Sequence, residues 1–213
     1  MRKRTAASGI ALTWLAFLGG CATPGPLHVY SLPAAGAERN VTDHGDGRTA
    51  EVPAFLEADD RVSGFAYDPF TDHFFLRLEP GDTIRVGDRP ARAIKREFAI
   101  EGAATTGRGD LAVRPRDGHL FLLAAETVIE TTRLGKHVRT FALAGAGAAP
   151  IGLALDPGQG RLLALATDGR RVTVHDLQGA RLAEFTLAQA AGPSLAFDPE
   201  KRELYAPLRG RAG

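Results

Sequence analysis

A five-residue motif recurs four times in this chain, and it constrains the possible folds more than any other feature of the sequence. Every copy has Ala in its second place, Asp or Arg in its fourth and Pro in its last. The fourth places of successive copies are 46, 42 and 42 residues apart. Regular spacing of this length is typical of proteins built from stacked copies of one small structural unit. The copies occupy residues 65–69, 111–115, 153–157 and 195–199.

Each copy of the motif predicts a short β-strand that ends in a turn. Apolar residues lead into an Asp-Pro or Arg-Pro pair, and proline cannot continue the hydrogen-bonded ladder of a sheet. A second apolar segment begins five residues after each Asp or Arg, at His73, His119, Arg161 and Glu203. This constant offset predicts four tight hairpins.

Two further strands follow each of the first three hairpins. The third alternates polar and apolar residues, most clearly over residues 171–177, and the fourth contains Phe98, Phe141 or Phe185. Four strands in about 42 residues are the signature of a β-propeller blade, so we predict an all-β fold, a small β-propeller. A β-sandwich is the alternative with many short strands. Helices are disfavoured because Gly and Pro interrupt the sequence too often.

The fourth repeat is truncated, and its missing strands have counterparts near the N-terminus. Residues 27–32 match the third strand, residues 54–56 match the end of the fourth, and residues 33–50 read as an inserted loop. We therefore predict a ring of four blades in which N-terminal strands close the last blade, which removes open sheet edges. The propeller domain covers residues 27–213, with repeats that start near residues 64, 110, 152 and 194.

The first 26 residues predict export and lipidation rather than part of the fold. A basic start and a short apolar run make residues 1–20 a signal peptide. The run ends in Leu18-Gly19-Gly20-Cys21, which resembles the lipobox of bacterial lipoproteins, and Cys21 is the only cysteine of the chain. We expect lipid on Cys21, a tether over residues 21–26, and, because Ala22 follows the cysteine, an outer-membrane protein that faces the periplasm.

The charge balance gives no reason to expect nucleic acid as a partner. Without residues 1–20 the chain has 23 Lys and Arg against 25 Asp and Glu. Proteins that bind nucleic acid through its phosphates carry a basic excess or a basic cluster.

The repeated motif, the apolar second strand and the Phe of the fourth strand resemble the blades of NHL-repeat and YVTN-type propellers, over roughly residues 62–208. The resemblance implies no single activity, because these superfamilies include binding proteins, scaffolds and enzymes. Their rings commonly have six or more blades, so this chain would be a minimal relative, a remnant, or half of a larger ring completed by a homodimer. No Trp follows Trp14, so the Trp-Asp signature of WD-type blades is absent.

The resemblance does not carry an active site onto this sequence. The related senescence-marker-protein lactonases hold a divalent ion with Glu, Asp and Asn, whereas Asn40 is the only Asn in this chain and falls in the predicted loop. The same loop offers weak metal ligands at Asp43, His44 and Asp46, although these residues lack the calcium-loop spacing and suit a solvated turn. There is also no Gly-x-Ser-x-Gly motif. We therefore expect no cofactor.

The favoured hypothesis is a membrane-anchored periplasmic binding or scaffold module, with a protein or a small ligand as its partner. The alternatives are a metal-assisted lactonase or esterase-like hydrolase at the channel mouth, and half of a larger propeller. For the binding face we select Arg61, Arg108 and Asp110, which precede first strands, and Arg114, the one departure from Asp in the motif. Loops between blades are where propellers usually bind.

Overall fold

The computed structural model describes residues 28–32, 56, 60–79, 83–91, 93–100, 109–147 and 149–207. Within these residues the regular structure is β-strand, joined by turns. None of them forms a helix of the length and apolarity needed to cross a membrane.

Three antiparallel sheets have the four-stranded order of a propeller blade, and a fourth sheet has three strands. Blade 1 consists of β2 Arg61–Asp68, β3 His73–Glu79, β4 Thr83–Asp88 and β5 Ala93–Ala99. Blade 2 consists of β6 Leu111–Arg114, β7 His119–Ala124, β8 Thr127–Thr131 and β9 His137–Ala142. Blade 3 consists of β10 Gly152–Asp156, β11 Arg161–Leu165, β12 Arg171–Asp176 and β13 Arg181–Thr186. Blade 4 consists of β14 Ala196–Asp198, β15 Glu203–Pro207 and β1 His28–Leu32.

The strand boundaries confirm the all-β prediction of a small four-bladed propeller. Every first strand ends on the Asp or Arg of the motif, and every second strand begins five residues later, at the positions expected from the sequence. The turns between them form for the expected reason. Asp156, for example, accepts backbone N–H bonds from Gly158 and Gln159 at 3.1 and 3.2 Å.

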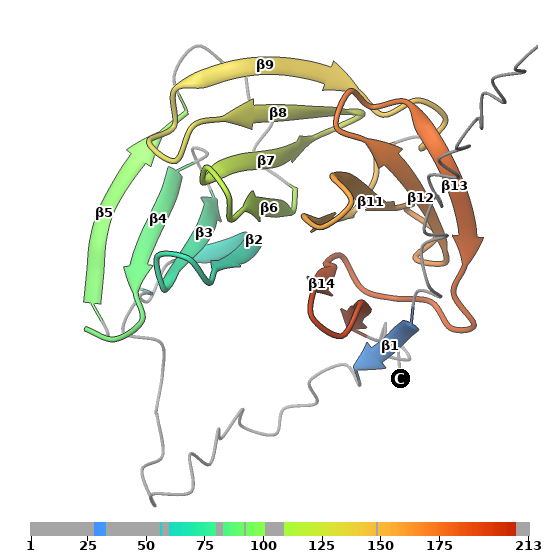
Figure 1. The fold of residues 1–213 in the computed structure, drawn as a ribbon, viewed down its shortest axis with the longest axis horizontal. Helices are drawn as coiled ribbons and strands as arrows, with labels where there is room; N and C mark the ends of the chain where they lie inside the picture. The colour runs from blue at the N-terminus through green and yellow to red at the C-terminus, as the bar shows by residue number, and fades with distance from the viewer. Residues whose placement is uncertain are drawn as a thin grey trace, which may run out of the picture.

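The four sheets lie around a common axis with their first strands innermost (Figure 1). Three apolar clusters join blade 1 to blade 2, blade 2 to blade 3, and blade 3 to blade 4. Residues from the first and third places of the motif pack toward the preceding blade, as Leu111 and Val113 do against Ala66. The Ala in the second place packs toward the following blade, as Ala112 does beside Leu153. The described residues contain no such cluster between blade 4 and blade 1.

The turns between third and fourth strands also hold neighbouring blades together. Gly179 has a φ of 88°, and a Cβ atom on it would lie 2.1 Å from the carbonyl oxygen of Ala142 and 2.9 Å from the ring of Phe141. Gly135 approaches Phe98 of blade 1 in the same way. Only glycine fits this turn, because it needs both a left-handed backbone and the absence of a side chain.

An N-terminal strand joins the last blade, as the sequence predicts, but its direction differs from that of the other third strands. β1 pairs with β15 in parallel, with His28 opposite Glu203 and Leu32 opposite Pro207, whereas β4, β8 and β12 are antiparallel to their second strands. A pattern with a period of two residues is the same in both directions, so the sequence match could not determine the orientation. The loop predicted at residues 33–50 and most of the predicted fourth strand lie outside the described residues.

Candidate functional site

The axis of the ring is occupied by the side chain of Asp110, which is fully buried. Its Oδ2 atom accepts the backbone N–H of Leu153 at 2.9 Å and of Leu195 at 3.0 Å, and its Oδ1 atom accepts the N–H of Leu111 at 3.0 Å. The N–H of Phe65 is a fourth backbone donor to this carboxyl group. One side chain therefore binds the first strands of all four blades.

Two opposing effects act on the charge of Asp110. Burial raises the pKa of this carboxyl group, and the four backbone N–H bonds act in the opposite direction. Burial dominates, and the pKa of Asp110 is raised to about 7.

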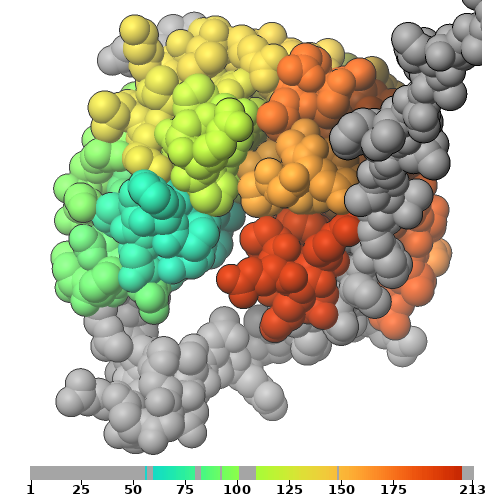
Figure 2. Space-filling view, viewed as in Figure 1, coloured from blue at the N-terminus to red at the C-terminus, as the bar shows by residue number. Residues whose placement is uncertain are grey.

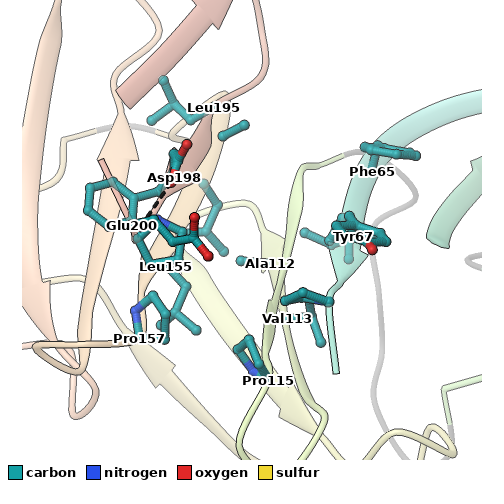
Figure 3. Close-up of a pocket in the computed structure, with 17 residues that line it drawn as sticks. Phe65, Tyr67, Ala112, Val113, Pro115, Leu155, Pro157, Leu195, Asp198 and Glu200 are labelled. Atoms are coloured by element: carbon teal, nitrogen blue, oxygen red, sulfur yellow. Dashed lines mark hydrogen bonds between the residues drawn. The ribbon is translucent and has the colours of Figure 1, made fainter. Parts of the chain in front are cut away.

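One cavity lies at the end of the axis where the first strands meet their Asp-Pro or Arg-Pro turns. It has a volume of about 430 Å³ and is lined mainly by the first, third and last residues of the four motifs. Figure 3 shows Phe65 and Tyr67 on β2 facing this space, with Leu155 and Pro157 of blade 3 on the other side. Concave, mostly apolar sites of this size are typical of ligand-binding pockets.

The aromatic side of the cavity is formed by side chains of blade 1 that have no counterpart exposed in the same way in blade 2 or blade 3. Phe65 and Tyr67 occupy the motif places that pack against the preceding blade in blades 2, 3 and 4, yet they are 47% and 39% exposed. Phe74 of β3 packs beside both, with ring centroids at 5.2 Å from Phe65 and 5.4 Å from Tyr67. Figure 2 shows an opening between these strands of blade 1 and the β14–β15 hairpin.

The opposite side of the cavity carries acidic groups from the last motif. Asp198 and Glu200 both line it, and the backbone N–H of Glu200 donates to Oδ1 of Asp198 at 2.9 Å (Figure 3). The ammonium group of Lys201 lies 4.0 Å from Asp198 and is largely exposed. The cavity thus combines aromatic side chains on β2 with carboxylates on the β14–β15 turn.

A second hollow, of about 730 Å³, lies at the opposite end of the first strands. Gly64, Gly109 and Ser194 line it, together with Pro150 and Thr167. Asp110 follows Gly109 directly, while the next residue, Leu111, lines the first cavity. The buried carboxyl group therefore lies between the two hollows.

The structure does not bring the residues selected for the binding face together. Arg61 is exposed at the beginning of β2, Asp110 is buried on the axis, and Arg114 ends β6. Asp110 is fully buried, because the convergence of four strands places its side chain inside the ring. Arg114 lies at the other end of its strand from Asp110, and Arg108 lies outside the described residues.

Arg114 belongs to a charged cluster inside blade 2. Its guanidinium lies 2.8 Å from Asp117 and 3.0 Å from the buried Glu130. Glu130 also lies 2.7 Å from Nδ1 of His119 and 2.6 Å from Nε of Arg139. Burial opposes ionisation of Glu130, but the hydrogen bonds from His119 and Arg139 outweigh it and lower its pKa.

The sequence analysis missed the partner of Arg114, although the repeat contained a signal for it. Glu130 stands on β8 where Val86 stands on β4 and Val174 on β12. Blade 2 therefore departs from the repeat twice, with Arg in place of Asp and Glu in place of Val. Comparison of the third strands would have predicted this pair.

The remaining sequence candidates supply no site in the described part of the chain. Cys21, Asp43, His44 and Asp46 lie outside it. Across the described residues, no group of three or more His, Cys, Asp or Glu side chains is arranged to hold a metal ion.

Comparison with known proteins identifies the fold and no family. No family model matches the chain, and no curated protein matches its sequence. A solved structure of the hydrazine synthase of Kuenenia stuttgartiensis matches with a TM-score of 0.52 and 14% identity, over 80% of this chain and 46% of that one. The WD40 repeats of RRP9 match with a TM-score of 0.50 and 15% identity, over 67% of this chain and 43% of that one. U3-55K gives a TM-score of 0.48 and 16% identity, over 67% and 44% of the two chains.

The first two similarities show the fold alone, and identity this low carries no information on activity. Together with the four sheets around one axis, they define the chain as a β-propeller. The chain spans less than half the length of the solved chains named above.

Proposed function

We propose that this protein is a binding module whose ligand site is the cavity at the Asp-Pro end of the propeller axis. The observation that carries this proposal is the exposure of Phe65 and Tyr67, at 47% and 39%, inside a cavity of about 430 Å³. Their counterparts Leu111, Val113 and Leu153 are buried between blades. Aromatic side chains exposed in a concave site can bury a large apolar area when a ligand binds.

The ligand class follows from the two sides of the cavity. Phe65, Tyr67 and the prolines of the motifs favour an apolar or aromatic group, carried by a small molecule or by a side chain of a partner protein. The carboxylates of Asp198 and Glu200 favour a neutral or positively charged group next to it and disfavour an anion.

Binding of the neutral apolar dye Nile red tests the site directly. The variant Phe65→Ala/Tyr67→Ala should bind the dye at least about tenfold more weakly, since each aromatic ring contributes roughly 1–2 kcal/mol of apolar contact. Leu134→Ala/Leu182→Ala is the matched control, because both leucines are exposed on outer turns or strands, at 64% and 55%. Equal loss of dye binding in the control, or none in the aromatic variant, would refute the proposed site.

We further propose that the module is anchored by lipid on Cys21 at the outer membrane and faces the periplasm. The support is the sequence of residues 1–21, with its basic start, short apolar run and lipobox. The variant Cys21→Ser should lose both membrane partition and signal-peptide cleavage in a Gram-negative host. Retention of both would contradict lipid attachment.

One observation favours a second candidate, a homodimer that uses the same aromatic surface. The side of blade 1 that carries Phe65, Tyr67 and Phe74 resembles the sides that blades 2 to 4 bury against a neighbour. A second copy that buried this surface would give a dimer by light scattering, and Phe65→Ala would convert it to a monomer. A monomer at micromolar concentration in the unaltered protein would exclude this use.

A further inference from the structure

The four N–H groups that surround Asp110 are equivalent positions of the repeat. They belong to Phe65, Leu111, Leu153 and Leu195, which are the first residues of the four motifs. Because the blades are related by rotation about the axis, these N–H groups point toward one central volume. Backbone N–H groups that converge in this way favour a carboxyl oxygen as their shared acceptor. We call this arrangement, together with the Asp110 side chain, the axial site.

Only one blade supplies a carboxylate to the axial site. The residues before the four motifs are Gly64, Asp110, Gly152 and Ser194. A Cβ atom on Gly64 would lie 2.9 Å from the carbonyl oxygen of Gly109, and one on Gly152 would lie 3.1 Å from the Leu195 side chain. Backbone atoms at Gly64 and side-chain atoms at Gly152 therefore already occupy the space that a Cβ atom would need there.

Asp110 also bridges the two blades that share no apolar cluster within the described residues. Leu195 belongs to blade 4 and Phe65 to blade 1, and their N–H groups donate to the same carboxyl group. The contact between Asp110 and Leu195 joins positions 85 residues apart in the sequence. At this point of the ring, polar contacts to Asp110 take the place of the apolar packing that joins the other blades.

We propose that the N–H groups of Phe65, Leu111, Leu153 and Leu195 form a binding site for a small monocarboxylate, which the protein fills with its own Asp110 side chain and thereby holds blade 4 against blade 1. The site is separate from the proposed ligand cavity, because Asp110 is fully buried and does not line that cavity. Its chemistry fits formate or acetate, since the carboxylate and methylene of an aspartate have the same heavy atoms as acetate.

The test is to remove the side chain and supply the carboxylate from solution. Asp110→Gly should lower Tm by about 10 °C, since the hydrogen bonds from several backbone N–H groups to this side chain are lost and a domain of this size changes by about 2–4 °C for each kcal/mol. Sodium formate, titrated at pH 6, below the raised pKa of Asp110, and at constant ionic strength with NaCl, should then raise Tm saturably. A concentration of about 20 times the dissociation constant should restore about 5 °C. Acetate should act similarly, and propionate less because of its size.

Three control proteins test whether the axial site is the cause of the stabilisation by formate. The unaltered protein should show no saturable response to formate. Asp156→Ala, which removes a carboxylate from a strand-end turn, should lose stability without rescue. Asp110→Asn should also lose stability without rescue, because its amide still fills the volume while its NH₂ group faces other donors.

The outcomes decide the proposal even if one variant folds poorly. If Asp110→Gly is unfolded in NaCl, formate should restore its far-ultraviolet circular dichroism, and NaCl should not. The proposal is wrong if Asp110→Gly keeps the Tm of the unaltered protein. It is equally wrong if formate fails to stabilise Asp110→Gly more than Asp156→Ala.

Discussion

The charged cluster in blade 2 allows a sharp test of how the repeat tolerates its two departures. Arg114 and Glu130 lie 3.0 Å apart, with side-chain exposures of 15% and 3%. In blades 1 and 3 the same two places hold Asp with Val, as Asp156 does with Val174. The double substitution Arg114→Asp/Glu130→Val therefore restores the pair used by the other blades.

Each single substitution should be costly, because each leaves a buried charge without its partner. Glu130→Val removes the acceptor shared by Arg114, Arg139 and His119. Loss of one member of a buried pair costs about 3–5 kcal/mol. We expect about 3 kcal/mol here, because Arg114 keeps Asp117 and because Arg139, at 36% exposure, can reach water. Arg114→Asp should cost about as much, since it places a third carboxyl group beside Glu130 and Asp117.

The double variant should instead lie within about 1 kcal/mol of the unaltered protein, because it gives blade 2 the Asp and Val that blades 1 and 3 hold at these places. The coupling energy from urea denaturation of all four proteins should then be about 5–6 kcal/mol. The exposed pair Arg181 and Glu184, at 43% and 32% exposure, is the control and should couple by less than about 1 kcal/mol when both are changed to Ala. Additivity within about 0.5 kcal/mol at Arg114 and Glu130 would refute the argument.

Three further predictions address the axis and the blade contacts. Burial raises the pKa of Asp110 to about 7, so its ionisation lowers the free energy of unfolding as pH rises from about 4 to about 7. Over that range the free energy of unfolding of Asp110→Asn, measured by urea denaturation, should rise relative to that of the unaltered protein by on the order of 4 kcal/mol at most. A constant difference between the two proteins would contradict this. His175, buried beside Thr173, has its pKa lowered by burial, so its stabilising contribution is present above its unfolded pKa of about 6.5 and is lost as pH falls. The stability advantage of the unaltered protein over His175→Thr should therefore shrink between pH 8 and pH 5, and growth on acidification would contradict it. Gly179→Ala should lower the free energy of unfolding by about 2–3 kcal/mol in the same assay, because its Cβ atom would lie 2.1 Å from the Ala142 carbonyl oxygen. Gly158→Ala, whose Cβ atom would have its nearest neighbour at 3.4 Å, should change stability by less than about 0.5 kcal/mol. Equal effects would show that the turn does not fix the blade contact.

Most of the fold was predictable from the sequence because its determinants are local. Alternation of polar and apolar residues specifies a strand, and Asp-Pro specifies where it ends. The second strands accordingly begin at His73, His119, Arg161 and Glu203 as expected. The repeat then specified the number of blades, since each 42-residue unit makes one sheet.

The functional parts were less predictable because they depend on contacts between distant segments. The sequence placed Asp110 beside a first strand, but only closure of the ring brings it to N–H groups up to 85 residues away. The repeat marked Arg114 as an exception, and the sheet then placed Glu130 beside it. Phe65 and Tyr67 follow the motif fully, and they are exposed because, within the described residues, blade 4 does not pack against them as the other blades pack against one another.

The sequence by itself therefore determined the strands, their turns and the propeller architecture, since each follows from the preferences of a few neighbouring residues. The tertiary structure decided which residues are buried, paired or exposed at the axis, and it decided the parallel direction of β1. The physical reason is that the first strands have similar local sequences in every blade. What distinguishes them is the surface that the adjoining blade presents, and that surface exists only after the ring has formed.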